Sequence, residues 1–347
     1  MIDTLSSAAG VVVIVVVASD IFRSLLVPRA SSRRFRLGPI LTAALFPLWQ
    51  AIADRVPNAD ARQPLRASLA PLMLVLSLFI WAALLIFGFA LIFWSERAGF
   101  ESRLSGFPDA LYAAGLAFTT LGGADIVSDD SARLTIVACG LAGFATVTVV
   151  ATFLISIQSG FGRRETLVLR LEAHVTLPPT GTAILETYAR EHIVERLGPF
   201  FDAWETWAAE VAISHRAFPV LIFFRSNDSR CEWLTALGAV LDAAALLDTV
   251  LAEVPPSARA ASHFVERTGS RLLDDLGRQL GAVPSPEPVD IARFAADCER
   301  LAKAGYILVD DRQAALGCFA EARRRFAPML AALSKRLHIE VEDTIRR

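Results

Sequence analysis

Two long apolar segments without a single charge constrain this chain more than any other feature. No charged side chain occurs in residues 67–95 or in residues 134–162. A helix of roughly 20 residues crosses the ~30 Å of bilayer hydrocarbon, and both segments exceed that length. We therefore expect two membrane-spanning helices, in keeping with a chain that is 54% hydrophobic.

A third apolar segment, residues 8–28, contains Asp20 and Arg23 near its end. These two residues are three positions apart, so they can pair on one helix face. A signal peptide is the alternative interpretation, but no basic segment precedes the valine-rich run. The segment is predicted to be a third span.

The arginines predict the orientation of these spans. They cluster after the first span, before the second and after the third: Arg23, Arg29, Arg33, Arg34, Arg36; Arg55, Arg62, Arg66; Arg163, Arg164. Because basic residues concentrate on the cytoplasmic side, we expect a multi-pass protein of the plasma (inner) membrane with its N-terminus and residues 96–133 outside. Residues 39–53, flanked by arginines, are predicted to form an interfacial helix, and the C-terminal region is expected in the cytoplasm.

Within the external segment, the sequence predicts a short helix over residues 107–119. Pro108 suits the first helical turn, and Asp109 complements the positive end of the helix dipole. At 1.5 Å per residue the helix would reach only about halfway through a bilayer, so the chain must turn back. Backbone at that depth is tolerated where protein covers it or water lines it, and the helix C-terminus favours a cation there.

These residues resemble the pore module of tetrameric potassium channels. The similarity lies in Asp109-Ala110-Leu111-Tyr112, in a filter-like Thr119-Thr120-Leu121-Gly122-Gly123-Ala124-Asp125, and in Gly140 and Gly143 of the following span, where the family often has a hinge glycine. It covers residues 67–162. It implies an outer helix, a pore helix, a selectivity filter and an inner helix, a homotetramer, and potassium as the permeating ion.

The sequence departs from the family pattern at two filter positions. Gly123 replaces an aromatic residue that braces the filter, and Ala124 replaces a glycine, which would cost roughly 1–2 kcal/mol in a left-handed conformation. We therefore expect weakened potassium selectivity, with sodium also passing, while Asp125 forms an acidic ring at the outer mouth. A simple turn is the alternative, since Gly-Gly is common in turns; the ordered series of features favours the pore.

The small residues of the last span leave two interpretations open. Gly140 and Gly143 could be a gating hinge or could permit close helix packing. Thr146, Thr148 and Thr152 could face a wet cavity or bond to their own helix backbone.

The sequence predicts three regions: residues 1–66 with a span and an interfacial helix, residues 67–164 as the pore module, and residues 165–347 as a helical cytoplasmic domain for regulation or assembly. In the last region we expect helices over 178–197, 233–254, 290–304 and 312–335, and a strand or short buried segment within 219–224.

Two short motifs of this half have simple structural interpretations. Gly160-Phe161-Gly162 follows a membrane helix and is expected to be a flexible exit. Arg323, Arg324 and Arg325 are expected to form a solvated face, with contact to anionic lipid as the alternative.

Chemistry-bearing patterns are otherwise few. Cys139, Cys231, Cys298 and Cys318 form no CxxC pair and are expected to be buried thiols, and the five histidines are dispersed. The net charge of −2 speaks against a nucleic-acid partner. The sequence thus predicts an all-helical membrane protein that passes monovalent cations, in contact with lipid, with no cofactor, no resident metal and no enzymatic activity. The alternative is a non-conducting scaffold or sensor that uses a degenerate pore module to oligomerise.

Overall fold

The chain is helical throughout the part that the structure describes. The computed structural model describes residues 2–25, 51–52, 55–56, 68–100, 104–122, 130–226 and 228–339. Two compact units, Met1–Gln158 and Ser159–Arg347, divide it. The described residues form no strand, and Leu251 and Leu308 make an isolated bridge, so the predicted all-helical class is confirmed there. Most of the predicted interfacial helix, 39–53, lies outside the described residues.

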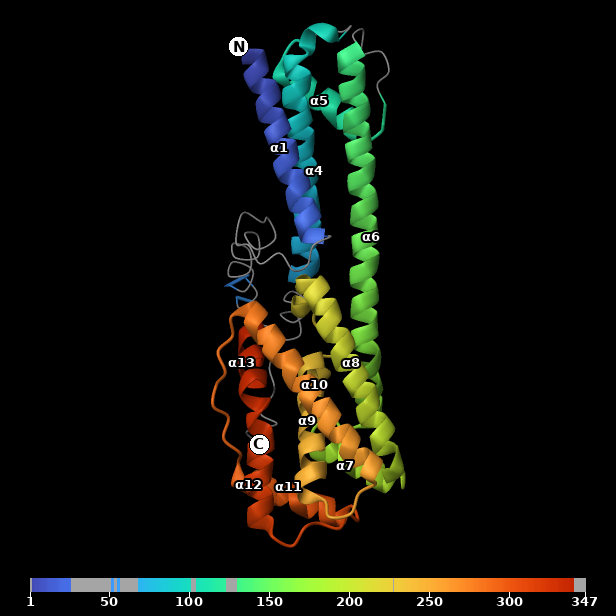
Figure 1. Cartoon of the computed structure of the whole chain (residues 1–347), viewed down its shortest axis with the longest axis vertical. Helices are drawn as coiled ribbons and strands as arrows, with labels where there is room; N and C mark the ends of the chain where they lie inside the picture. The colour runs from blue at the N-terminus through green and yellow to red at the C-terminus, as the bar shows by residue number, and fades with distance from the viewer. Residues whose placement is uncertain are drawn as a thin grey trace. The chain divides into compact units, whose positions relative to one another are not determined.

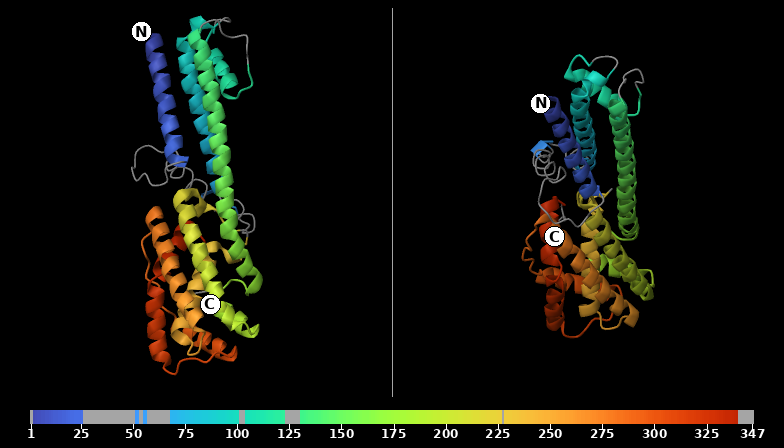
Figure 2. Two further views of the ribbon diagram at one scale, coloured as in Figure 1. Left: turned by 45° about the vertical axis from the view of Figure 1, so that its right-hand side comes forward. Right: turned by 45° about the horizontal axis from the view of Figure 1, so that its top comes forward.

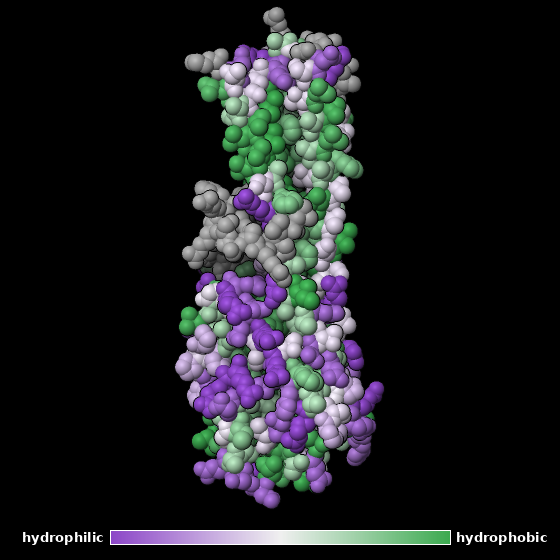
Figure 3. Space-filling view, viewed as in Figure 1, coloured by the Kyte–Doolittle hydropathy of each residue, from purple (hydrophilic) through white to green (hydrophobic). Residues whose placement is uncertain are grey.

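The first unit contains α1 (Ile2–Leu25), α4 (Leu69–Ser95), α5 (Phe107–Phe118) and residues 130–158 of α6 (Asp130–His174) (Figure 1). Helices α1, α4 and α6 are long and apolar enough to cross a membrane, and they lie on the three predicted spans, of which residues 26–28 and 67 are outside the described residues. Their outward surface carries a green, hydrophobic band below a more polar end (Figure 3). Large apolar side chains are exposed on these helices, among them Phe79, Leu141 and Phe144, as expected where lipid is the solvent.

Helices α1 and α4 lie side by side along their length (Figures 1 and 2). Glycines allow this close approach: a Cβ on Gly10 would lie 2.5 Å from the carbonyl oxygen of Gly88.

Two polar pairs also join α1 and α4. At one end Asp3 forms an ion pair with Arg97, and further along Trp81 Nε1 donates to Asp20 at 2.8 Å. The sequence predicted Arg23 as the partner of Asp20; the structure gives it an indole donor on α4.

The second unit is a helical domain built around α9 (Trp233–Val250). It comprises residues 159–174 of α6 and six further helices: α7 (Gly181–Arg190), α8 (Leu197–Ala217), α10 (Pro256–Leu280), α11 (Ile291–Lys303), α12 (Arg312–Arg324) and α13 (Ala327–Leu337). Helix α9 is also long and apolar enough to span a membrane, but 83% of its apolar window is buried by its neighbours. An all-round apolar helix is expected at the centre of a core.

Several expectations for this domain need correction. The helix predicted over 178–197 begins after its cap, Thr180, and ends at Arg190. The helix predicted over 312–335 is two helices, because the chain turns at Arg325 and Phe326 ahead of Pro328. Helices α8 and α10 were not foreseen. The apolar run at 219–224, expected to be a strand or a short buried segment, is a short 3₁₀ helix, Pro219–Phe223, in which Leu221 and Ile222 are buried.

Candidate functional site

The short helix α5 begins as the sequence predicted. One carboxylate oxygen of Asp109 accepts hydrogen bonds from the Ser105 backbone N–H (2.9 Å), the Ser105 hydroxyl (2.6 Å) and the Gly106 N–H (3.2 Å). Pro108 occupies the first turn, where its missing N–H has no cost. The negative charge and these bonds satisfy donors that would otherwise be free at the helix N-terminus.

Small residues hold α5 against its neighbours. Ala110, Ala113 and Ala114 are buried, and the Cys139 thiol of α6 lies 3.5 Å from the Ala114 carbonyl oxygen. Such side chains let helix backbones approach closely without a large core between them. Twelve residues at 1.5 Å per residue cannot cross a bilayer, so α5 has the length of a re-entrant helix.

The end of α5 reverses the chain at the predicted filter residues. The N–H of Leu121 donates to the Leu116 carbonyl (3.2 Å) and the N–H of Thr120 to the Ala117 carbonyl (3.2 Å). Thr120 adopts the left-handed conformation (φ 57°). This pair of bonds around a left-handed residue is the Schellman helix ending, and threonine rather than glycine at that position costs roughly 1–2 kcal/mol.

Four of the seven predicted filter residues are placed by the structure. Thr119, Thr120, Leu121 and Gly122 follow the C-terminus of α5 and are exposed in the single chain, and Gly122 also has a positive φ of 77°. The other three, Gly123, Ala124 and Asp125, lie outside the described residues, so the left-handed Ala124 and the acidic ring stay predictions.

Gly143 of α6 marks the contact with this turn. A Cβ at Gly143 would lie 1.9 Å from the Phe118 carbonyl oxygen, and one at Gly140 would lie 3.4 Å from the Ala117 carbonyl oxygen. The α6 helix runs unbroken through both glycines. Gly143 thus lets the α6 backbone pack closely against the end of α5. A hinge at Gly140 or Gly143 stays a prediction.

The threonines of α6 bond to their own helix. The hydroxyls of Thr146, Thr148 and Thr152 donate to the carbonyls of Ala142 (2.7 Å), Phe144 (2.9 Å) and Thr148 (2.9 Å). Of the two interpretations that the sequence left open, backbone bonding is the one observed.

A second centre lies in the other unit, where the last turns of α6 enter the helical domain. Residues 160–164 are helical rather than a flexible exit. Arg164 is fully buried and its guanidinium donates to the carbonyls of Leu221 (3.0 Å) and Phe224 (2.8 Å). It pairs with Glu165 at 2.9 Å.

Aromatic rings enclose the Arg164 guanidinium. Its centre lies 5.0 Å from the Trp233 ring and 5.3 Å from the Phe161 ring, a cation–π arrangement that is strongest when desolvated. Trp207 Nε1 donates to the Arg164 carbonyl at 2.8 Å. Burial lowers the pKa of Arg164, but arginine stays protonated at any physiological pH. A buried charge must be paired, so this cluster fixes the end of α6 in the domain.

His215 completes the cluster as a neutral ring. Its Nδ1 lies 2.9 Å from the Val211 carbonyl oxygen and its Nε2 lies 3.4 Å from Arg164 Nη1. Burial, and secondly the charge of Arg164, lower the pKa of His215 to about 3. The ring therefore donates from Nδ1 and accepts at Nε2, and contributes no positive charge.

Sequence reasoning missed this cluster, although a signal was present. Buried positions on α6 continue beyond the apolar span with helical spacing: Ile157, Gly160, Arg164, Val168, Leu171. The sequence predicts Arg164 only as one of the cytoplasmic arginines that orient the spans, whereas the structure buries it. Arg323 was likewise expected in solvent but is buried against Asp242, while Cys318 is exposed, unlike Cys139, Cys231 and Cys298.

Comparisons with known proteins place few limits on these sites. No family model matches the chain, and no solved structure matches it. It is 26% identical over 212 residues to YdjJ of Bacillus subtilis (strain 168), described as an uncharacterized membrane protein, and the match covers 60% of each chain. Among the described residues, no group of three or more histidines, cysteines or carboxylates could hold a metal ion.

Proposed function

We propose that this chain is a multi-pass protein of the inner membrane whose homotetramer passes monovalent cations through a pore module formed by α4, α5 and α6. The observation that carries the proposal is the placement of α5. A helix too short to span is held by backbone-to-backbone contact at Gly143 against a helix of spanning length, with Thr119–Gly122 at its C-terminal end. The membrane placement is also supported by the relative's printed description.

The physical role of α5 is to direct partial negative charge toward the ion path. Its last carbonyls carry the negative end of the helix dipole, and a ring of roughly four copies would bring Thr119–Gly122 of each chain around one axis. Potassium is the expected ion, with sodium passing as well because Gly123 and Ala124 replace the bracing aromatic and the second glycine. In this proposal the helical domain, residues 165–347, regulates or assembles the pore from the cytoplasm.

Purified protein in planar bilayers under opposing potassium and sodium gradients tests this proposal. We expect a cation current whose reversal potential lies between the two equilibrium potentials. The double substitution Gly123→Tyr with Ala124→Gly should move it toward potassium, and Asp125→Asn should reduce conductance most at low salt. A wild-type potential that follows potassium alone would contradict the weak-selectivity part, and the absence of any current would contradict conduction.

The second candidate is a non-conducting scaffold or sensor that oligomerises through the same module. The specific observation in its favour is the Schellman ending at Thr120, which closes α5 with hydrogen bonds that any helix end can use. Native mass measurement separates the outcomes: a tetramer without current supports the scaffold, a stable dimer contradicts the pore, and a stable monomer contradicts both.

Orientation can be tested with thiols that the chain already offers. Cys318 is exposed in the helical domain, and Asp130, whose side chain is 93% exposed, is the first residue of α6 in the membrane unit. A membrane-impermeant maleimide applied to intact cells should spare native Cys318. It should label Asp130→Cys in a Cys318→Ser background. Labelling of both positions from one side would overturn the topology.

A further inference from the structure

A buried carboxylate that the proposed pore does not use lies at the start of α9 in the helical domain. Glu232 directly precedes the helix, and its side chain is 4% exposed. One carboxylate oxygen accepts from Arg225 Nη1 at 3.1 Å, and the other accepts from the Ser226 backbone N–H at 3.0 Å. Since a buried charge must be paired, the ionised form of Glu232 depends on Arg225.

Arg225 also holds the C-terminal end of α13. Its Nη2 donates to the carbonyl oxygens of Leu337 (2.9 Å) and His338 (2.7 Å). His338 ends the helix in the left-handed conformation (φ 50°), and the next N–H, of Ile339, donates back to the Ser334 carbonyl at 3.0 Å. A residue with a Cβ is strained in that conformation. The two bonds from Arg225 offset this strain, so the helix ending depends on the guanidinium.

Ser226 connects Glu232 to the end of α6. Its hydroxyl donates to the Glu165 carboxylate at 3.2 Å and accepts from the Trp233 backbone N–H at 3.0 Å. Glu165 is in turn the ion-pair partner of Arg164, at 2.9 Å. A continuous series of hydrogen bonds and ion pairs therefore joins α6, the start of α9 and the end of α13 inside the helical domain.

The charge of Glu232 depends on pH and on its neighbours. Burial raises its pKa above the ordinary value of 4.5, and Arg225 and Arg164 act in the opposite direction. Because Arg225 lowers this pKa only while it is bound, the carboxyl binds a proton more tightly after Arg225 has left, so acid favours release. Other charged or titratable groups around Glu232 and the adjacent thiol are Glu165 and Glu172 of α6, Asp228 and Cys231 before α9, His215 of α8 and His338 after α13.

We propose that Glu232 is a proton-operated latch, which ties the C-terminal end of α13 to α6 while its carboxylate is ionised. A proton from solvent neutralises the carboxylate, Arg225 loses its ionic partner, and the strained ending at His338 opens. The latch lies within the helical domain and stands independently of the pore. Its effect on the ion path, through the end of α6, rests on the proposed function, where it makes cytoplasmic acidification the regulating signal.

Hydrogen exchange of the full-length protein in detergent tests the latch, with mass spectrometry of peptides that cover residues 327–339. Exchange is expressed relative to the intrinsic rate at each pH, and α10 is the internal reference for changes of the whole domain. In wild type, exchange at the end of α13 should rise about 10- to 100-fold between about pH 7.5 and about pH 5, the effect of one charged hydrogen bond. Glu232→Gln keeps the shape of the protonated side chain. It should exchange as fast at about pH 7.5 as wild type does in acid, with no further rise.

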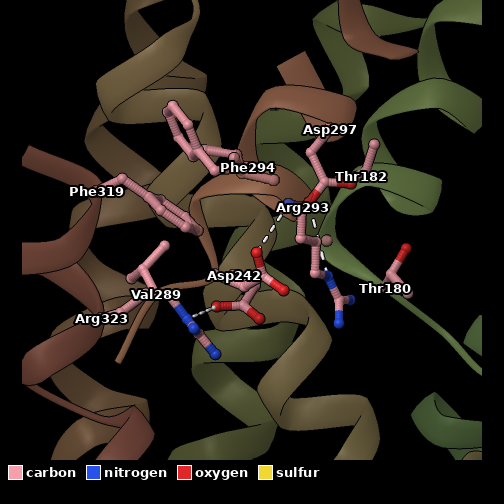
Figure 4. A pocket seen from close by; sticks show the side chains of 12 residues that line it. Thr180, Thr182, Asp242, Val289, Arg293, Phe294, Asp297, Phe319 and Arg323 are labelled. Atoms are coloured by element: carbon pink, nitrogen blue, oxygen red, sulfur yellow. Dashed lines mark hydrogen bonds and ion pairs between the residues drawn. The ribbon is translucent and has the colours of Figure 1, made fainter. Parts of the chain in front are cut away.

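Asp297 of α11 provides the matched control. Burial raises the pKa of this carboxyl as well, but it bonds to Thr182 of α7 and lines a small cavity of about 40 Å³ beside Arg293 (Figure 4). Asp297→Asn should therefore leave the exchange of α13 and its pH response as in wild type.

Three results would overturn the latch: a wild-type α13 that exchanges equally at both pH values, a pH response that persists in Glu232→Gln, or the same acceleration in Asp297→Asn. The wild-type series needs no substitution, so a variant that fails to fold leaves the test intact. Since exchange is measured without ion flow, failure here leaves the conduction proposal untouched, and the reverse also holds.

Discussion

The burial of Arg164 beside the exposed Arg163 offers a matched pair of substitutions. Arg164→Ala would leave the Phe224 carbonyl without the guanidinium donor and would remove the cationic partner of the Glu165 carboxylate. Removing one partner of a buried ion pair costs about 3–5 kcal/mol. Arg163 is exposed and bonds only to Ser159 Oγ at 2.8 Å, so Arg163→Ala should change stability by less than about 0.5 kcal/mol.

Thermal unfolding of the full-length protein in detergent, followed by tryptophan fluorescence, measures this difference. The Trp233 ring lies 5.0 Å from the guanidinium centre, so the cluster contributes to the emission of the six tryptophans. For a domain of this size, 1 kcal/mol corresponds to roughly 2–4 °C, so Arg164→Ala should lower the domain's melting temperature by roughly 6–20 °C. Arg164→Lys should fall between, because the charge stays but the planar set of donors is lost. Equal melting temperatures for the Arg163 and Arg164 variants would refute the reasoning.

Two further predictions concern the membrane unit and pH. Gly143→Ala places a methyl group 1.9 Å from the Phe118 carbonyl oxygen, so melting should show destabilisation by about 1–3 kcal/mol. Gly162→Ala, with nothing within 4 Å, should stabilise by up to about 1 kcal/mol; equal effects would refute the close contact. His215 has a folded pKa of about 3 against 6.5, so below pH 6.5 the unfolded chain binds a proton that the folded one does not. Stability should be full above pH 6.5 and fall by about 2 kcal/mol by pH 5, and parallel denaturant-derived pH profiles for wild type and His215→Phe would contradict this.

The sequence predicted best where physical chemistry leaves one solution. An uncharged apolar segment that is long enough to cross a bilayer is expected to be helical. Pro108 and Asp109 mark the start of α5, because both residues suit the first turn of a helix. The helix expected over 290–304 is α11, and Asp290 is its cap, a position that aspartate favours.

The errors arose where tertiary packing decides. Glycines at 160 and 162 favour flexibility locally, but the domain buries Arg164 between them and the following turns, so the helix continues. Arg323 belongs to a run of three arginines that reads as a solvated face, yet Asp242, 81 residues away, draws it into the core. The sequence around Arg323 contains no pattern that indicates Asp242 as its partner.

The Asp242–Arg323 pair has a consequence for biosynthesis. Helix α9 is as apolar as a membrane span, so while the chain is being made it faces a choice between the bilayer and a core not yet assembled. An aspartate near the middle of such a helix raises the cost of insertion by about 2.5–3.5 kcal/mol. In the folded domain the same carboxylate meets Arg323 at 2.8 Å. Asp242, together with Asp248 near the end of α9, would thus disfavour insertion of this helix into the bilayer until α12 has been synthesised and Arg323 can pair with Asp242.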